Sequence, residues 1–232
     1  DLEYNIAQMR NLFCPSACNV DIQTTMNFKF TGTAIYAEQN NAVFNINIPN
    51  GVTVNVNGDV ALDGFDGLSS NERGATINVD GILNVTDTFY ARAYNSVQPA
   101  QLTIGSDAVV RVGYFNFNNN VSGSTQNFQL NIIPGGRLQI DTALNLIGGT
   151  FISTAAVELK SESNTHAAII DNFSPGHNGA FSGVITFERY HSTTNGLTFE
   201  RHRFSTPVAN MPLSRWNANG NVGYLLNTNC ND

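Results

Sequence analysis

The stretch VTVNVNGDVAL (residues 52–62) alternates apolar and polar side chains on both sides of a glycine. The same eleven-residue pattern returns as ATINVDGILNV (75–85), LTIGSDAVVRV (102–112) and LNIIPGGRLQI (130–140). A period of two is typical of β-strands with one buried face. The apolar positions keep their phase through the small seventh residue, whereas a two-residue hairpin would place them on opposite faces. Each copy therefore predicts a strand, a kink and a second strand, and not a hairpin.

The spacing of the copies predicts how they are arranged. Their seventh residues follow one another after 23, 27 and 28 positions. A unit of this length that cannot bury its apolar face alone is typical of a solenoid. We therefore expect an all-β fold, a right-handed parallel β-solenoid (β-helix) with a C-terminal β-hairpin or cap segment. Coils about 4.8 Å apart would stack the third residues of the copies, in the order Val54, Ile77, Ile104 and Ile132.

The pattern divides the chain into three expected segments. Residues 1–40 break the alternation and are expected to cap the first coil, and residues 41–165 are expected to form the coils. Residues 166–232 are expected to form a C-terminal β segment and a tail. In that segment FSGVITFERY (181–190) and LTFERHRFSTPV (197–208) are predicted to be two strands joined by HSTTNG.

The composition excludes several functional classes. The chain has 232 residues and a net charge of −7, with only 12% charged residues, so we expect no nucleic-acid partner, which would require clusters of Lys and Arg. No apolar run approaches the length that spans a bilayer, so no membrane span is expected. Asparagine supplies 33 residues, which makes the chain polar without making it charged. The start at Asp1 fits a chain whose signal peptide has been removed.

Two motifs resemble secreted surface proteins of Bacteroidota. The first is the glycine-centred repeat itself. The second is the later run Val184, Ile185, Phe187, Arg189 and Tyr190, followed by FSTPV at residues 204–208. The resemblance covers residues 40–208 and implies export by type IX secretion, with a role in adhesion or the cell envelope. The chain shows no recognisable C-terminal sorting domain, so it is expected either to be a fragment or to be retained by another route.

Four residues are candidate glycosylation sites. O-glycosylation in Bacteroidota often follows an Asp-Ser/Thr-aliphatic pattern, so the resemblance nominates Thr142 in the sequence Asp-Thr-Ala. Three N-x-S/T sequons begin at Asn84, Asn120 and Asn172, and they would matter in a host that glycosylates asparagine.

The remaining candidate sites are sparse. Asp63, Asp66 and Glu72 are a candidate for Ca²⁺ because they supply oxygen ligands, although they lack the order of an EF-hand loop, and the alternative is an ordinary acidic turn. We expect no other cofactor. The disulfide candidates are Cys14, Cys18 and Cys230, and the pairing stays open. The four histidines show no metal or catalytic spacing, so packed or surface histidines are expected.

Aromatic residues follow the second and third copies of the repeat. Stacked coils would bring Tyr90, Tyr94, Tyr114, Phe115 and Phe117 together along one edge. They are expected to form either a hydrophobic corner under loops or a patch for sugar stacking or self-association.

These observations predict a non-enzymatic structural or adhesive β-solenoid, secreted or on the bacterial cell surface. Its partners would be other copies docked end to end, or surface proteins and glycans. One alternative is a subunit of an extracellular filament, because solenoid ends expose strand edges. A second alternative is a protein that binds or cleaves polysaccharides, which would require clustered carboxylates.

Overall fold

A computed structural model describes the chain, which divides into two compact units, Asp1–Ser192 and Thr193–Asp232. The residues that the structure describes all lie in the first unit. The described residues are 3–4, 11–14, 18–29, 34–37, 44–62, 73–92, 100–119, 128–163 and 166–188. Within these residues the regular structure is entirely β, with no helix.

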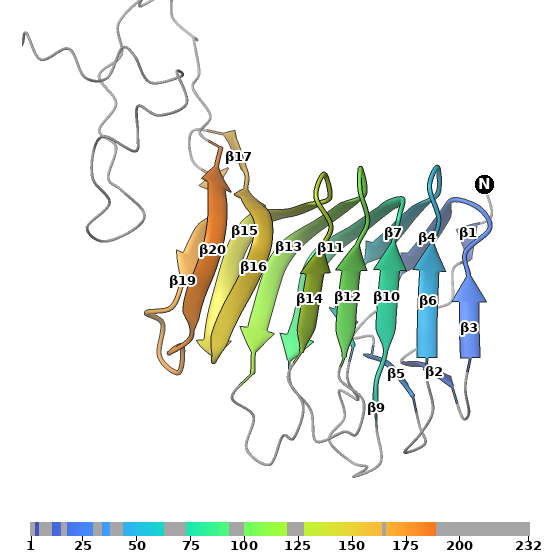
Figure 1. Ribbon diagram of the computed structural model, residues 1–232, viewed down its shortest axis with the longest axis horizontal. Coiled ribbons are helices and arrows are strands. Elements are labelled where there is room, and N and C mark those ends of the chain that lie inside the picture. Colours follow the sequence, from blue (N-terminus) through green and yellow to red (C-terminus); the bar gives the residue numbers. More distant parts are fainter. Residues whose placement is uncertain are drawn as a thin grey trace, which may run out of the picture. The chain divides into compact units, whose positions relative to one another are not determined.

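Two parallel sheets run through the first unit (Figure 1). The smaller sheet consists, in order, of β3 (Cys18–Asp21), β6 (Phe44–Ile48), β10 (Thr76–Val79), β12 (Gln101–Ile104) and β14 (Gln129–Ile132). The main path of the larger sheet consists of β1 (Glu3–Tyr4), β4 (Met26–Lys29), β7 (Thr53–Asn57), β11 (Ile82–Arg92), β13 (Val109–Asn118), β15 (Arg137–Gly148), β16 (Thr150–Leu159) and β20 (Ala180–Phe187). Shorter strands join its sides: β2 (Asn11–Cys14), β5 (Ala34–Ala37), β8 (Val60–Ala61), β9 (Arg73–Gly74) and β19 (Ile169–Asp171). A small separate pair is formed by β17 (Ser161–Ser163) and β18 (His166–Ala167).

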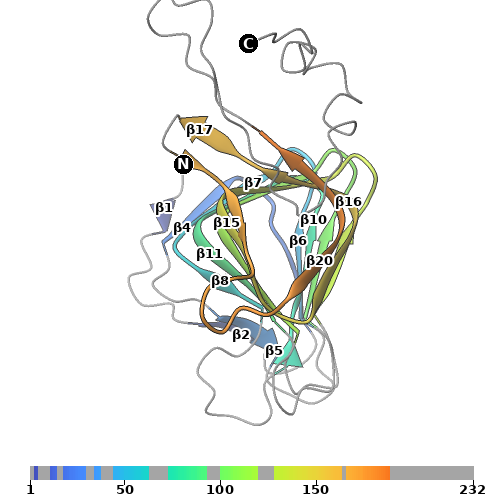
Figure 2. The same ribbon diagram turned by 90° about the vertical axis from the view of Figure 1, so that its left-hand side faces the viewer.

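From β1 to β15, strands that are consecutive in the chain do not pair with each other. β10 pairs in parallel with β6 and β12, whereas the following β11 pairs with β7 and β13. The chain therefore runs along one sheet, turns a corner, runs along the other sheet and returns one coil further on. Figure 2 shows these coils along the direction of stacking. This confirms the predicted β-solenoid and the kink in place of a hairpin.

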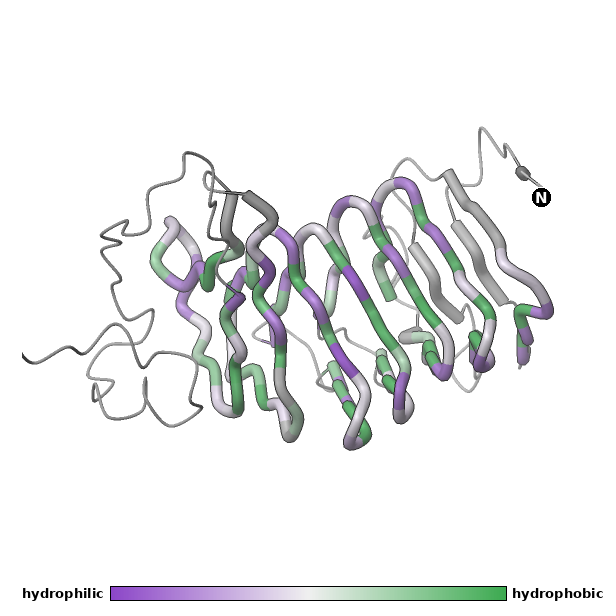
Figure 3. Tube along the Cα trace, turned by 90° about the horizontal axis from the view of Figure 1, so that it is seen from above, coloured by the Kyte–Doolittle hydropathy of each residue, from purple (hydrophilic) through white to green (hydrophobic). Residues whose placement is uncertain are grey.

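The inward positions of the coils form continuous apolar columns. Leu83 pairs with Val110, which pairs with Leu138, and all three are buried. Figure 3 shows how hydrophobic and hydrophilic residues alternate along each coil. Burying an aliphatic side chain of this size stabilises the fold by about 1.5–3 kcal/mol. The columns are therefore the main source of cohesion between coils.

The predicted register is correct for part of the repeat and wrong for the rest. Ile104 lies beside Ile132 as expected. Val54, however, pairs with Leu83, and Ile77 pairs with Ile46 and Leu102. Val54 lies on β7, the second strand of its coil, whereas Ile77 lies on β10, so the first quoted stretch begins in the middle of a coil.

The two-residue shift of Ile77 arises from corners of different lengths. Val54 follows Ile48 by six positions and Val110 follows Ile104 by six, whereas Leu83 follows Val79 by only four. The longer corners are closed by a four-residue turn, with bonds from Val52 N to Pro49 O, Ala108 N to Gly105 O and Gly136 N to Ile133 O. The third residue of each turn has a positive φ, namely 80° at Gly51, 66° at Asp107 and 97° at Gly135. These are the features of type II turns, which the coil at Gly81 lacks.

Asp107 is the one non-glycine residue with a positive φ among the described residues. A left-handed conformation costs an L-residue about 1–2 kcal/mol, and aspartate tolerates it better than a branched residue does. We expect Asp107→Gly to be at least as stable as the wild type. We expect Asp107→Val to be about 1–2 kcal/mol less stable than the glycine variant. Chemical denaturation of the three proteins measures this difference, and equal stability of the two variants would contradict the turn assignment.

Parallel pairing extends beyond the segment expected to form the coils. It includes β3 and β4, before residue 41, and it reaches β20, where Phe151 pairs with Phe181 and Val157 with Ile185. The first strand of the predicted C-terminal hairpin is therefore a coil strand parallel to β16. Its predicted partner, residues 197–208, lies outside the described residues.

Candidate functional site

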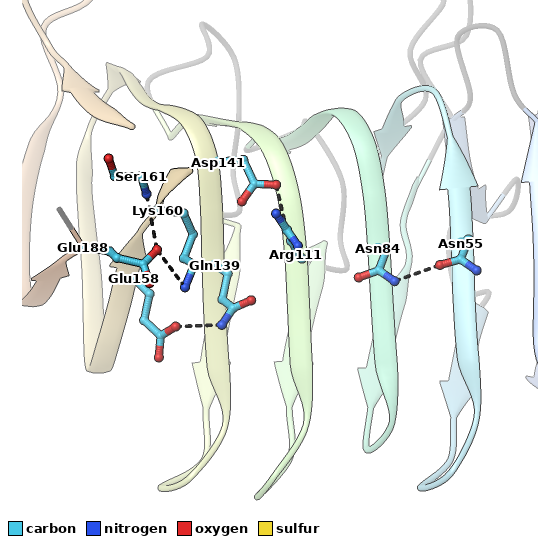
Figure 4. Close-up of polar contacts among 9 residues, drawn as sticks. All are labelled: Asn55, Asn84, Arg111, Gln139, Asp141, Glu158, Lys160, Ser161 and Glu188. Carbon is cyan, nitrogen blue, oxygen red and sulfur yellow. Dashed lines mark hydrogen bonds and ion pairs between the residues drawn. The ribbon is translucent and has the colours of Figure 1, made fainter. Parts of the chain in front are cut away.

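Rows of asparagine side chains run across the outer faces of the coils. Asn84 on β11 pairs in register with Asn55 on β7, and its Nδ2 donates a hydrogen bond of 2.8 Å to the Oδ1 of Asn55 (Figure 4). The same geometry recurs on β15, where Asn145 Nδ2 donates to Asn116 Oδ1 over 2.5 Å. These rows are the most regular polar feature of the described residues.

The smaller sheet carries an equivalent row. Asn78 Nδ2 donates to Asn47 Oδ1 over 2.8 Å, and Asn47 Nδ2 donates to Asp21 Oδ1 over 2.6 Å. In each of these pairs the later coil donates and the earlier coil accepts. An amide can both donate and accept, so a row of them links coils without the repulsion between like charges. Many of the asparagines are therefore explained by the hydrogen bonds that they form between neighbouring coils.

The row that begins with Asn55 and Asn84 becomes charged in the later coils. Its next members by strand pairing are Arg111, Gln139 and Glu158. Gln139 Nε2 donates to Glu158 Oε2 over 2.7 Å, and Arg111 Nε lies 2.8 Å from Asp141 Oδ2 (Figure 4). Residues distant in the sequence thus form one polar face.

Lys160 and Glu188 extend this face to the last coil. Lys160 Nζ lies 3.0 Å from Glu188 Oε2, and the Ser161 amide donates to the same oxygen over 3.3 Å. The hydrogen bond from Lys160 lowers the pKa of Glu188. Because Glu188 is about half exposed, water screens this pair and it contributes little stability. The three carboxylates of the face, those of Asp141, Glu158 and Glu188, thus each contact a donor through one oxygen.

The candidate Ca²⁺ ligands Asp63, Asp66 and Glu72 lie outside the described residues. Within the described part of the chain, no three His, Cys, Asp or Glu side chains are grouped so that they could hold a metal ion. Cys14 ends β2 and Cys18 begins β3, while Cys230 lies outside the described residues. The disulfide pairing therefore stays a prediction.

The candidate glycosylation sites differ in their surroundings. Asn172 is exposed after β19, whereas the Nδ2 of Asn84 is engaged by Asn55 and so is not free for a sugar. Thr142 is half-buried at an irregularity of β15, between its pairings at Ile140 and Ala143. Asn120 lies outside the described residues. Asn172 is therefore the best placed of the three described candidates.

The predicted aromatic patch is not a surface feature as a whole. Phe115 and Phe117 are 0% and 3% exposed, so they belong to the core and cannot stack on a sugar. Tyr114 is exposed, Tyr90 is half-buried, and Tyr94 lies outside the described residues. Of the two expected alternatives, the burial of the two phenylalanines fits a hydrophobic corner and not a surface patch. The expected stacking between coils does occur inside, where Phe115 lies parallel to Phe89 with ring centroids 5.4 Å apart.

Asp171 organises the turn after β19. Its Oδ1 accepts hydrogen bonds from the amides of Phe173 at 3.2 Å and Ser174 at 3.0 Å. Its Oδ2 lies 3.2 Å from Nδ1 of His177, which forms an ion pair when the imidazole is protonated. Burial raises the pKa of Asp171, but the hydrogen bonds from Ser174 and Phe173 and the charge of His177 outweigh it, so the pKa is lowered.

The lowered pKa predicts a contribution to stability that depends on pH. Because the pKa of Asp171 is lower in the folded chain, its contribution is present above the unfolded value of about 3.9 and is lost as pH falls through the folded pKa. We expect Asp171→Asn, which keeps the accepting oxygen, to lose less stability than the wild type when pH falls from about 5 to about 3. Thermal unfolding at both pH values measures this, and identical losses would contradict the assignment.

A hollow of about 550 Å³ lies between β14 and β16. Its lining includes the side chains of Gln129, Asn131, Thr150 and Ile152, which are exposed, and no charged residue. β14 pairs with β12 on one edge, and among the described strands nothing pairs with its other edge. The hollow therefore combines neutral polar side chains with the open edge of a strand.

Comparison with protein-family models, with curated proteins and with solved structures finds no match for this chain. In the part of the chain that the structure describes, no helix has the length and apolar character needed to cross a membrane.

Proposed function

We propose that this chain is a non-enzymatic structural or adhesive β-solenoid of the bacterial cell surface. The observation that carries the proposal is that outward polar side chains form hydrogen bonds between neighbouring coils. Asn84, Asn78 and Asn145 each donate to an asparagine one coil earlier, so side chains that are able to bind a ligand are instead tying coils together. Such a surface is suited to a rigid spacer.

The charged face supports the same proposal. Arg111, Gln139 and Lys160 each contact a carboxylate over 2.7–3.0 Å. A glycosidase needs a pair of carboxylates that are free to protonate a leaving group and to act as base or nucleophile. Here each of the three carboxylates contacts a donor through one oxygen, while Asp141 Oδ1 is buried without a hydrogen-bond partner among the described residues. The location at the cell surface rests on the resemblance to secreted proteins of Bacteroidota and on the low content of charged residues.

The proposal is tested by antibody labelling of intact cells that make the protein, together with a panel of polysaccharides incubated with the purified chain. We expect the intact cells to be labelled and no polysaccharide to be shortened. Labelling that requires permeabilised cells would contradict the location. Cleavage of a polysaccharide that is lost in Glu158→Gln but retained in Asn84→Gln would replace the proposal with the enzymatic alternative.

A second candidate function is the binding of a neutral glycan in the hollow between β14 and β16. The specific observation is its uncharged lining, in which polar residues such as Gln129 and Asn131 alternate with apolar ones, as in sites that bind neutral ligands. If this candidate holds, Asn131→Ala should reduce retention of the protein on a neutral polysaccharide matrix. Asn145→Ala, on another face, serves as the control, and equal losses in both variants would exclude the hollow as the site.

The filament alternative rests on the last coil. β20 pairs with β16, and among the described residues no strand pairs with its other edge. Val184 on β20 is 59% exposed. An open strand edge is a template for pairing with a second copy of the chain. End-to-end polymers seen by electron microscopy, and lost in Val184→Pro, would favour this alternative over a monomeric spacer.

A further inference from the structure

The corner turn at residues 49–52 presents an unusually accessible Asn-Gly pair. Asn50 and Gly51 are both exposed. The turn is closed by the bond from Val52 N to Pro49 O, and the Gly51 amide between the bonded groups has no acceptor among the described residues. A Cβ added at Gly51 would meet no atom within 4 Å, so the surroundings of this amide are open.

An exposed Asn-Gly pair can undergo an intramolecular reaction between its backbone and its side chain. The backbone nitrogen of the glycine can attack the side-chain carbonyl carbon of the asparagine, and glycine offers the least steric hindrance to this attack. A hydrogen bond on the attacking N–H or on the asparagine carbonyl holds the two groups in place and must open first. The local hydrogen bonds therefore decide how fast each Asn-Gly pair reacts.

Two further Asn-Gly pairs among the described residues provide an internal comparison. At Asn57–Gly58 the glycine amide donates to Thr86 Oγ1 over 3.0 Å, and Asn57 Oδ1 accepts from the same hydroxyl over 3.2 Å. At Asn178–Gly179 the buried glycine donates to Leu146 O over 2.9 Å. Both nucleophilic amides are thus engaged, unlike that of Gly51.

We infer that Asn50 is a site of spontaneous deamidation, a self-modification that acts on the corner between β6 and β7. The Gly51 nitrogen forms a bond to Cγ of Asn50, the bond from Cγ to Nδ2 breaks, and the NH2 group leaves as ammonia with the proton of the Gly51 amide. Water then opens the cyclic imide at either carbonyl and yields aspartate or isoaspartate. No oxidant, reductant or enzyme is required.

The product alters a contact between coils. Val52 O accepts a hydrogen bond of 2.9 Å from Ile82 N, and Val52 N donates to Pro49 O over 3.1 Å. Isoaspartate at residue 50 routes the main chain through Cβ and lengthens the turn by one bond, so the bond from Val52 N to Pro49 O is lost. Both products add a negative charge to this corner. The modified fraction therefore rises with the age of the folded protein, and each modified chain has lost a hydrogen bond at this corner.

The test is incubation of the full-length folded protein in mildly alkaline buffer, followed by peptide mapping with fragmentation that separates Asn50 from Asn57. We expect Asn50 to deamidate about tenfold faster than Asn57 and Asn178. In denaturant the three rates should converge, because each asparagine precedes glycine. Thr86→Ala, which removes the hydroxyl that holds Gly58, should raise the rate at Asn57 about tenfold and leave Asn50 unchanged.

Three outcomes would overturn the inference. The first is an Asn50 rate in the folded chain no higher than that of Asn57 or Asn178. The second is a tenfold preference for Asn50 that persists in denaturant, because the neighbouring sequence and not the fold would then be the cause. The third is an unchanged Asn57 rate in Thr86→Ala when the circular dichroism of the variant shows that it is folded.

Discussion

Replacement of Phe115 by alanine is expected to lower the free energy of unfolding by about 3–5 kcal/mol, the largest loss for a single core side chain. Phe115 is fully buried on β13. Its ring stacks on Phe89 at 5.4 Å and meets Phe128 at 6.4 Å and Phe151 at 5.7 Å edge to face. The substitution would leave a cavity that joins three coils, which explains the size of the expected effect. Denaturant unfolding followed by circular dichroism measures it.

Tyr114→Ala is the matched control because the two residues are adjacent on the same strand. Tyr114 is 38% exposed and points to the opposite face. Its replacement is expected to cost under about 1 kcal/mol. A similar loss in both variants would mean that Phe115 does not occupy the core as described.

Replacement of Gly81 by alanine is expected to cost on the order of 2–4 kcal/mol. A Cβ at this position would lie 2.3 Å from Val52 O and 2.5 Å from Pro49 O. Both are backbone atoms of the preceding corner, so no side chain can rotate away to relieve the clash. The coils would have to separate locally, and the bonds from Gly81 N and Asp80 N to Ile48 O would weaken with them.

Gly51→Ala is the control that separates the cost of this clash from the general cost of replacing a glycine. Its added Cβ would meet nothing within 4 Å, and only the φ of 80° opposes it, at a cost of about 1 kcal/mol. Chemical denaturation of both variants provides the comparison. If Gly81→Ala is as mild as Gly51→Ala, the coils do not approach as closely at this corner as the structure indicates.

The fold could be predicted because period-two alternation and a small kink residue depend on local sequence. The register of the smaller sheet could not, because it depends on corner length. Val79 reaches Leu83 in four positions, whereas Ile104 reaches Val110 in six, so an alignment centred on the small residue shifts β10 by two residues relative to β12.

The sequence left open whether the phenylalanines are buried, for a similar reason. Val112 and Phe115 both point inward although they are three positions apart, because the pairing of β13 shifts between Val112 and Tyr114. Period-two reasoning that ignores such a bulge assigns Phe115 and Phe117 to the outer face. The register shift between Val112 and Tyr114 has no strong signal in the sequence.

The asparagine rows were partly visible in the sequence, as asparagines at outward positions of several copies. Their pairing was not, since Asn55 and Asn84 meet only in the corrected register. The charged face could not be foreseen either. Arg111, Glu158 and Glu188 come from three different coils, and only the strand pairing brings them to one side.

The measurement that tests the proposed function most directly is the attachment of cells that lack the protein. It should be compared with attachment after complementation by the wild type and by Gly81→Ala. We predict that attachment falls without the protein and returns with the wild type, and that it returns only in part with the destabilised variant. Undiminished attachment in the deletion strain, accompanied by an inability to degrade a polysaccharide, would contradict a structural or adhesive role.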